Sequence, residues 1–399
     1  MDKIEELLTR GVDKIYPSKD ELEKVLRSGK KLKLYQGFDP TGTKLHIGHM
    51  VGFRKLRQWQ DLGHHVIFLI GDGTGQAGDP SGKTTARDKF LTREELRDNA
   101  VDYVKQAGKI VNFDGENPVE ILFNGDWLND LDLVDILEIA GHFTWQQLSE
   151  RDLFQERIKN HQPINLREFL YPLLQAYDSV AMDVDLELGG SDQTFNMLSG
   201  RNLMKSMKNK DKFVMTTPLL EDSEGRKIGK TEGNVIALTD SPETLYRKIM
   251  ALGDEIIVKG LEYLTGISMT EISEIKKKIK NEENPIQFKK RLAFEVTKQL
   301  NSDADAKRAE EEFERVVQNK EVPADALTLK INIKQPIITV ESVLVDNNLA
   351  SSKSEAKRLI EQGGVSLDNE RITDPNIEIK PSNNSILKVG KKIVKLVIK

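Results

Sequence analysis

Two histidines and two distant lysines are the residues whose types and spacing best suggest chemistry. The histidines bracket a glycine in His46-Ile47-Gly48-His49, and the lysines lie in Lys227-Ile228-Gly229-Lys230-Thr231. Cations and N–H donors suit the negative charge that grows on phosphate oxygens when ATP is attacked at its α-phosphate. A carboxylate that attacks there releases pyrophosphate and forms an acyl adenylate. Together the two segments therefore indicate adenylate chemistry.

The elements around the histidines determine how they can act. Residues 32–38 form a β-like run, 39–42 have the composition of a turn, and 51–59 have a helical pattern. This order predicts a strand, a loop and then a helix N-terminus, where free backbone amides favour anions. Taken alone, the histidine motif also fits a helix start whose histidines only cap or pack.

Between about residues 32 and 220, short β-branched runs alternate with helical stretches. This alternation predicts an α/β fold with a parallel sheet covered on both faces. The glycine-rich segment 71–83 lacks the spacing of a P-loop or a Rossmann fingerprint, so its glycines are expected to let the backbone approach a ligand closely. The expected strands are 33–38, 65–70, 119–123, 180–188 and 213–217.

The second half of the chain changes character. Residues 236–322 are helical and highly charged, and the acidic run 310–312 is expected on a solvated helix face. Prolines mark a linker at 323–336. A small domain is expected over 337–399, with helices at 340–347 and 354–362 followed by short strands. The catalytic domain is then expected over 1–235, with an insertion at about 124–162.

Composition excludes several classes of protein. The net charge of −5 argues against a general polyanion binder, so nucleic-acid contacts must come from local patches. The absence of cysteine excludes disulfides and thiolate metal sites. The apolar run 66–70 is too short to cross a bilayer, and the N-terminus does not resemble a signal peptide. We therefore expect a cytoplasmic protein without membrane association, and no protein-bound structural metal, since His142 and His161 lack partners at ligand spacing.

Further segments carry a resemblance to a known family. They are 35–41 (YQGFDPT), 78–83 (GDPSGK), 171–178 (YPLLQAYD) and 189–193 (GGSDQ), with 354–360 (SEAKRLI) and 363–365 (GGV) in the tail. With them, nearly the whole chain resembles bacterial-type tyrosyl-tRNA synthetases, which are class I enzymes with a C-terminal S4 RNA-binding domain. The resemblance implies a Rossmann-like catalytic domain, a helical anticodon-region domain at 236–322 and the S4 tail.

The same resemblance implies an activity and its partners. The enzyme would activate L-tyrosine with ATP and Mg²⁺, and transfer it to the 3′ end of tRNA-Tyr. The insertion at 124–162, which carries Trp127, Phe143 and Trp145, would form the interface of a homodimer.

Tyrosine differs from phenylalanine by one hydroxyl. A buried site that hydrogen-bonds this hydroxyl rejects phenylalanine, and this enzyme class is itself the standard example of such discrimination. By resemblance, Asp178 and Tyr35 bind the substrate phenol, and Gln193 orients the substrate carboxylate. The α-ammonium would be held by three acceptors, Asp79, Tyr171 and Gln175. Thr74 would line the same pocket.

The attacking carboxylate is already ionised at neutral pH, so the phosphate site needs charge and position rather than a base. The resemblance places Asp39, Gly190 and Asp192 at the ribose and nucleotide. It places around the phosphates Thr41, His46, His49, Lys83, Arg87, Lys227, Lys230 and Thr231. This chain departs from the common Lys-Met-Ser-Lys-Ser signature at Ile228, Gly229 and Thr231, but both lysines are present. Gly52 stands where some members have a threonine near the ribose.

The tail carries cations that suit tRNA phosphates. By resemblance and charge, the expected contacts are Lys353, Lys357, Arg358, Lys388, Lys391 and Lys392. Lysine-rich edge strands also serve to block aggregation, which is the alternative interpretation.

Three rival functions remain open from the sequence. A small-molecule nucleotidyltransferase would share the histidine motif but would have no use for the tail. An RNA-binding or splicing-helper protein derived from a synthetase would not need the intact set of Tyr35, Asp178, His46, His49 and Lys230. A tryptophan-specific synthetase would be atypical in its tail and in the segment 171–178.

Overall fold

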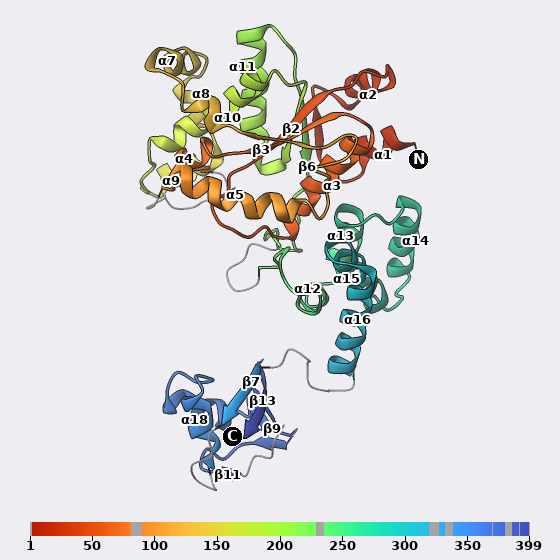
Figure 1. The fold of residues 1–399 in the computed structure, drawn as a ribbon, viewed down its shortest axis with the longest axis vertical. Coiled ribbons are helices and arrows are strands. Elements are labelled where there is room, and N and C mark those ends of the chain that lie inside the picture. Colours follow the sequence, from red (N-terminus) through yellow and green to blue (C-terminus); the bar gives the residue numbers. More distant parts are fainter. Residues whose placement is uncertain are drawn as a thin grey trace. The chain divides into compact units, whose positions relative to one another are not determined.

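The computed structural model describes residues 2–80, 90–228, 235–318, 327–331, 338–368, 370–379, 385–390 and 392–398. Contacts divide the chain into two compact units, Met1–Lys307 and Arg308–Lys399 (Figure 1).

The first unit is built on a six-stranded sheet in the order β1-β6-β5-β2-β3-β4. All neighbouring strands are parallel except β1, which pairs antiparallel with β6. The α/β parallel sheet predicted from the sequence is therefore confirmed. The strands are β1 (Lys14–Tyr16), β2 (Lys33–Phe38), β3 (His65–Ile70), β4 (Glu120–Phe123), β5 (Leu186–Gly190) and β6 (Phe213–Thr217).

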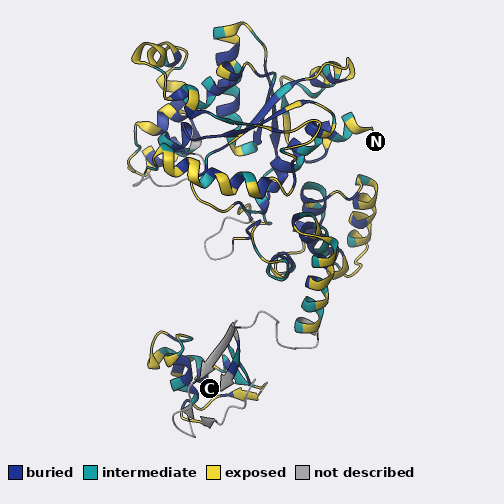
Figure 2. Cartoon of the chain, in the orientation of Figure 1, coloured by how far each residue is buried: buried dark blue, intermediate teal, exposed yellow. Residues whose placement is uncertain are grey.

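Apolar side chains explain why helices cover both faces of this sheet. In β3, five consecutive residues from Val66 to Ile70 are buried, as expected for a strand covered on both sides (Figure 2). Phe38 stacks on Phe68 with ring centroids 4.5 Å apart and contacts Phe53 of α3 (Ile47–Asp61) on one face. Tyr35 and Leu69 belong to the core that α10 (Arg167–Met182) and α11 (Thr194–Lys208) complete.

The helices of this unit that precede the charged region include two very short ones, α4 and α6, at the ends of β3 and β4. They are α1 (Lys3–Thr9), α2 (Lys19–Arg27), α3 (Ile47–Asp61), α4 (Thr74–Ala77), α5 (Arg93–Ala107), α6 (Gly125–Leu128), α7 (Leu133–Gly141), α8 (Trp145–Ser149), α9 (Asp152–Lys159), α10 (Arg167–Met182) and α11 (Thr194–Lys208).

One predicted strand is wrong. The run 180–188 is not a single strand, because α10 continues to Met182 and β5 begins only at Leu186. The helix ends on Asp183, which adopts a left-handed conformation with φ of 49°. Short apolar runs do not distinguish a buried helix end from a strand, and no glycine marks this helix end.

The charged region expected to be helical is helical. It forms α12 (Pro242–Met250), α13 (Ile256–Leu264), α14 (Met269–Lys280), α15 (Ile286–Leu300) and α16 (Asp303–Gln318). Proline at the first position of α12 and the side-chain cap of Ser241 explain where this series begins.

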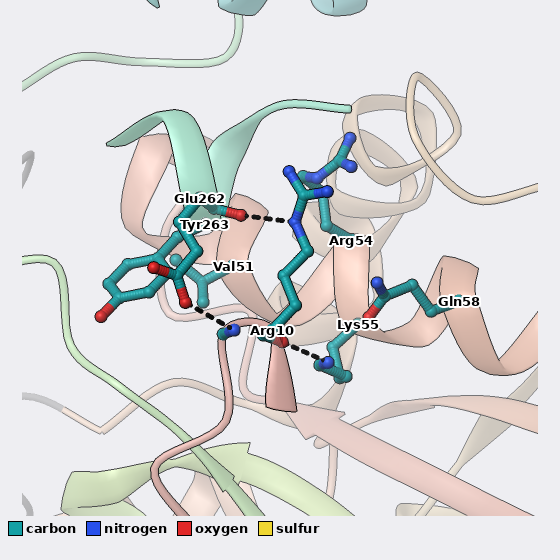
Figure 3. Close-up of a pocket in the computed structure, with 8 residues that line it drawn as sticks. Arg10, Val51, Arg54, Lys55, Gln58, Glu262 and Tyr263 are labelled. Atoms are coloured by element: carbon teal, nitrogen blue, oxygen red, sulfur yellow. Dashed lines mark hydrogen bonds between the residues drawn. The ribbon is translucent and has the colours of Figure 1, made fainter. Parts of the chain in front are cut away.

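Two buried cations join the N-terminal segment to α3 and α13 (Figure 3). Arg10 donates from Nε to the carbonyl of Glu262 at 2.9 Å and from Nη2 to the carbonyl of Thr265 at 2.6 Å. Lys55 of α3 donates from Nζ to the carbonyls of Leu7 and Arg10, at 2.8 and 2.5 Å. These cations satisfy carbonyls at two helix ends, where the last carbonyls lack helical partners. They hold the histidine-bearing helix against the helical region.

Lys55 predicts a pH dependence of stability. Burial, reinforced by Arg10, lowers the pKa of Lys55 from 10.5 to about 7. Between these values the unfolded chain binds more protons than the folded one, so this group makes the free energy of unfolding rise with pH, by at most about 1.4 kcal/mol per pH unit. We expect Lys55→Met to remove this slope. Urea unfolding at about pH 7.5 and pH 9.5 tests it, and an identical pH response in the variant would contradict it.

The second unit contains a five-stranded sheet in the order β10-β9-β12-β13-β7. Its strands are β7 (Leu327–Ile331), β9 (Val365–Leu367), β10 (Glu370–Ile372), β12 (Ile386–Val389) and β13 (Lys392–Ile398). A separate pair is formed by β8 (Ile338–Thr339) and β11 (Glu378–Ile379). The helices of this unit include α17 (Val340–Asp346) and α18 (Lys353–Glu361). β7 pairs in parallel with β13, although its residues lie within the stretch expected as a linker, so the tail sheet begins before residue 337.

Candidate active site

A cleft of about 820 Å³ opens where β2 and β5 end. This is the point at which strand order reverses in the sheet, and such crevices hold ligands in open α/β folds. Of the residues predicted for tyrosine and ATP, the following line the cleft: Tyr35, Asp39, Thr41, His46, His49, Thr74, Asp79, Tyr171, Gln175, Asp178, Gly190, Asp192, Gln193 and Lys227. Lys83, Arg87, Lys230 and Thr231 lie outside the described residues.

The two histidines form the N-terminal end of α3. His46 is the N-cap residue, and its Nδ1 accepts from the backbone N–H of Gly48 at 3.2 Å. His49 Nδ1 lies 3.2 Å from the backbone nitrogen of His46, and the two ring centroids are 4.0 Å apart. Because Nδ1 of His46 accepts, its proton belongs on Nε2, which is then a donor for a phosphate oxygen.

The segments on both sides of the second signature lie against the histidine motif. The backbone N–H of Ile47 donates to the carbonyl of Ile236 at 3.0 Å, and His46 forms an isolated β-bridge with Ala237. A Cβ added to Gly48 would lie 3.0 Å from the His46 ring and 3.7 Å from the carbonyl of Ile228. The absence of a side chain at Gly48 therefore lets Ile228 of the lysine signature lie close to the histidine motif.

Lys227 is engaged within the cleft. Its Nζ donates to Oδ2 of Asp192 at 2.7 Å, so the first lysine of the signature is paired with a residue expected at the ribose. Gly52 also has a structural role, because a Cβ there would lie 2.6 Å from the amide of Gln36. A threonine at that position would displace Gln36 from the cleft wall.

Asp178 lies at the deep end of the cleft and is 1% exposed. Its two oxygens accept from Asn124 Nδ2 at 3.0 Å and from Trp127 Nε1 at 2.9 Å. Burial raises the pKa of Asp178 well above its ordinary value, and the two N–H donors oppose that shift. Sequence reasoning missed both donors and expected Trp127 among the aromatic residues of an interface. Their position directly after β4, at the carboxyl edge of the sheet, was the available signal.

Tyr35 of β2 stands near Asp178 of α10. Its hydroxyl lies 3.1 Å from Oγ of Ser179. Burial, with Glu187 as the next cause, raises the pKa of Tyr35 well above 10, so the group remains a neutral phenol.

The groups expected at the substrate ammonium and carboxylate contact one another. Gln193 Nε2 donates to Oδ2 of Asp79 at 2.9 Å, and Asn196 Nδ2 donates to Oε1 of Gln193 at 2.8 Å. Thr74 Oγ1 donates to Oδ1 of Asp39 at 2.7 Å. This end of the cleft thus holds two carboxylates and an amide whose orientation is fixed.

The tail cations lie in two places within the second unit. Lys353, Lys357 and Arg358 are exposed on α18. Lys388 alternates along β12 with Leu387 and Val389, which join the core under α17 and α18, so Lys388 lies on the other sheet face. Lys392 begins β13, and Lys391 lies outside the described residues.

Two absences hold for the part of the chain that the structure describes. There, no group of three or more histidine, aspartate and glutamate side chains is arranged to hold a metal ion. Nor is any helix in those residues long and apolar enough to cross a membrane.

Comparison with known proteins shows the class of protein to which this chain belongs. Residues 27–318 match the family model of tRNA synthetases class I (W and Y), and residues 341–384 match the S4 domain model. The chain therefore belongs to the class I tRNA synthetases of this family. Its relatives over nearly the full length are tyrosine–tRNA ligases. That of Thermotoga maritima is 42% identical, covering 97% of this chain and 95% of that protein, and that of Dehalococcoides mccartyi is 40% identical, covering 98% and 97%.

Solved structures share the fold. A C-terminally truncated mitochondrial tyrosyl-tRNA synthetase of Aspergillus nidulans matches with a TM-score of 0.66 and 24% identity, covering 79% of this chain and 94% of that one. A tyrosyl-tRNA synthetase of Archaeoglobus fulgidus, solved with L-tyrosine, matches with a TM-score of 0.60 and 21% identity, covering 77% and 100%. At these identities the likeness concerns the fold alone.

Proposed function

We propose that the cleft binds L-tyrosine and ATP side by side and joins them as tyrosyl adenylate, with release of pyrophosphate. The activity is that of a tyrosyl-tRNA synthetase, which then transfers tyrosine to the 3′ end of tRNA-Tyr. The observation that carries this proposal is the convergence in one cleft of side chains from β2, α3, α10 and the β5 loop. The protein would act in the cytoplasm.

The phenol end of the site gives the amino-acid specificity. The substrate hydroxyl would donate to Asp178, whose oxygens already accept from Asn124 and Trp127 and which is therefore held in place. Tyr35 would contact the same hydroxyl from β2. Phenylalanine would leave these buried polar groups without partners, which is the physical basis for its rejection.

The other end of the substrate would replace contacts that exist in the free protein. The ammonium would take Asp79 from Gln193, and Nε2 of Gln193, whose oxygen stays bound to Asn196, would donate to the substrate carboxylate instead. Lys227 would likewise leave Asp192 for the phosphates when the nucleotide ribose occupies that carboxylate. In these exchanges each charged group of the free protein gives up one partner and gains another from the substrates.

Catalysis then depends on position and electrostatics. ATP would arrive with Mg²⁺, and the carboxylate of tyrosine would attack the α-phosphate in line. The N–H donors of His46 and His49 at the start of α3, together with Thr41, would face the phosphates. Lys83, Arg87, Lys230 and Thr231 are proposed to supply further charge, which lowers the barrier most when the contacts tighten in the transition state.

Removal of the residues after 318 tests the proposal that the tail serves only tRNA. We expect a chain that ends at residue 318, which removes β7 together with the rest of its sheet, to keep tyrosine-dependent pyrophosphate exchange, since the first unit is compact by itself. Charging of tRNA-Tyr should fall by about 10²-fold or more, because phosphate contacts supply much of the binding energy. Normal charging by the truncated chain would contradict the proposed role of Lys353, Lys357, Arg358, Lys388, Lys391 and Lys392.

Exposed apolar residues support the proposal of a homodimer. On α7 and α8, Leu133, Val134, Leu137 and Trp145 are 58–70% exposed. Such a concentration is typical of an interface. We expect Leu137→Asp to produce a monomer in sedimentation velocity, because a two-fold axis brings each buried charge into the interface twice. Val101→Asp, at an equally exposed apolar residue of α5, is the matched control, and monomer formation in both or in neither would contradict this interface.

A further inference from the structure

A buried ion pair lies beneath the part of the cleft proposed for tyrosine. Glu187 is in β5 and Lys212 directly precedes β6, and the two are 1% and 0% exposed. Lys212 Nζ donates to Oε2 of Glu187, and also to Oγ of Ser179 at 2.7 Å. Neither charged residue was predicted from the sequence to belong to the site.

The helix above the pair leaves room for it. A Cβ added to Gly200 of α11 would lie 2.7 Å from Lys212 Nζ, 3.0 Å from Ser179 Oγ and 3.2 Å from Glu187 Oε2. A buried ion pair contributes little net stability compared with apolar residues of similar volume. What distinguishes this pair is therefore its position, because Glu187 lines the cleft beside Gln175, and Lys212 reaches Tyr35 of the cleft through Ser179.

Glu187 fixes the orientation of Gln175. Gln175 Nε2 donates to Oε1 of Glu187 at 3.1 Å. A carboxylate only accepts, so the amide nitrogen must face Glu187 and the amide oxygen must point away from it. Gln175 lines the cleft, and its buried Oε1 has no hydrogen-bond partner among the described residues. A buried acceptor of this kind suits an ammonium group.

Lys212 fixes the direction of hydrogen bonds toward the phenol end. An ammonium only donates, so Ser179 Oγ must accept from Lys212. The hydroxyl proton of Ser179 then has two acceptors within reach, Tyr35 at 3.1 Å and Glu187 at 3.4 Å. Oε2 of Glu187 already accepts from Lys212, so the shorter contact to Tyr35, in which either hydroxyl could donate, is the better place for the Ser179 proton and leaves the Tyr35 proton for the substrate. The substrate hydroxyl can then accept from Tyr35 and donate to Asp178.

We propose that Glu187 and Lys212 are positioning residues for the substrate tyrosine. Glu187 turns the oxygen of Gln175 toward the substrate ammonium, and Lys212, through Ser179, makes Tyr35 a donor to the substrate hydroxyl. This inference rests on the proposed function. It predicts that one buried pair controls recognition at both ends of the substrate.

Separate variants test the two arms. Ser179→Ala interrupts the phenol arm and keeps the ion pair, and we expect it to lower the ratio of kcat/KM for tyrosine over phenylalanine about 10-fold. Glu187→Gln lets the amide of Gln175 turn over. We expect it to raise KM for tyrosine about 10-fold with a smaller change in kcat, and to weaken inhibition by tyramine more than inhibition by 3-(4-hydroxyphenyl)propionate, which lacks the ammonium.

The double variant Lys212→Met with Glu187→Gln removes both charges, avoids the uncompensated buried ammonium that Glu187→Gln alone leaves, and should show both defects. Glu168→Gln is the matched control, because Glu168 forms another buried ion pair, with Arg157, and does not line the cleft. Variants whose selectivity and inhibition ratios match this control, in a wild type that activates tyrosine, would overturn the inference alone. A wild type that activates no tyrosine would overturn the proposed function and the inference with it.

Discussion

Replacing Asp178 with alanine is expected to lower the preference for tyrosine over phenylalanine by roughly 10- to 100-fold, because a hydrogen bond to a charged group is worth ~1.5–3 kcal/mol. The carboxylate is almost fully buried, and Asn124 and Trp127 hold both of its oxygens, so its position relative to the substrate hydroxyl is fixed. Most of the loss should appear in tyrosine activation, since phenylalanine has no hydroxyl to lose.

The ratio of kcat/KM for the two amino acids is the appropriate measurement, because it does not depend on the fraction of folded enzyme. Asp178→Asn tests the same point with an isosteric side chain. Trp127→Phe is a graded control that removes one of the two anchors and should have a smaller effect. An unchanged ratio in Asp178→Ala would remove this residue from the specificity site.

Replacing Lys230 with alanine is expected to slow adenylate formation by ~10²-fold or more, while the dissociation constant of ATP changes far less. The residue lies outside the described residues, but the chain on either side of it contacts the start of α3 through Ile228 and Ile236. The proposed role of Lys230 is a contact with the phosphates, and a contact that tightens only in the transition state affects rate more than affinity.

Single-turnover kinetics separates the two quantities for Lys230→Ala. Lys227→Ala is the comparison, because Lys227 is paired with Asp192 in the free protein and its loss should also change binding of the ribose. Equal losses of rate and ATP affinity in Lys230→Ala would show that it is an ordinary ground-state ligand.

The sequence predicted the parts of this protein whose signals are local. β2, β3 and β6 match the expected ranges, because their apolar runs are bounded by turns and helical patterns. The histidines were expected at a helix start and lie there, where His46 serves as N-cap. The order of strand, turn and helix was sufficient for both.

What the sequence did not predict depends on distant residues. Ser179, Glu187 and Lys212 meet only because α10 packs against the paired strands β5 and β6, and Asn124 reaches Asp178 of α10 from the end of β4, contacts that no local pattern encodes. The end of α10 was misread because Asp183 replaces the usual glycine cap. β7 was missed because its partner β13 lies near the end of the chain.

Pyrophosphate exchange, measured with each of the twenty amino acids, is the most direct test of the central claim that this cleft activates tyrosine. We expect ATP–pyrophosphate exchange with tyrosine, with phenylalanine lower by several orders of magnitude and no signal from tryptophan. Exchange that is strongest with tryptophan or another amino acid, or that is absent with tyrosine although the protein is folded, would contradict it.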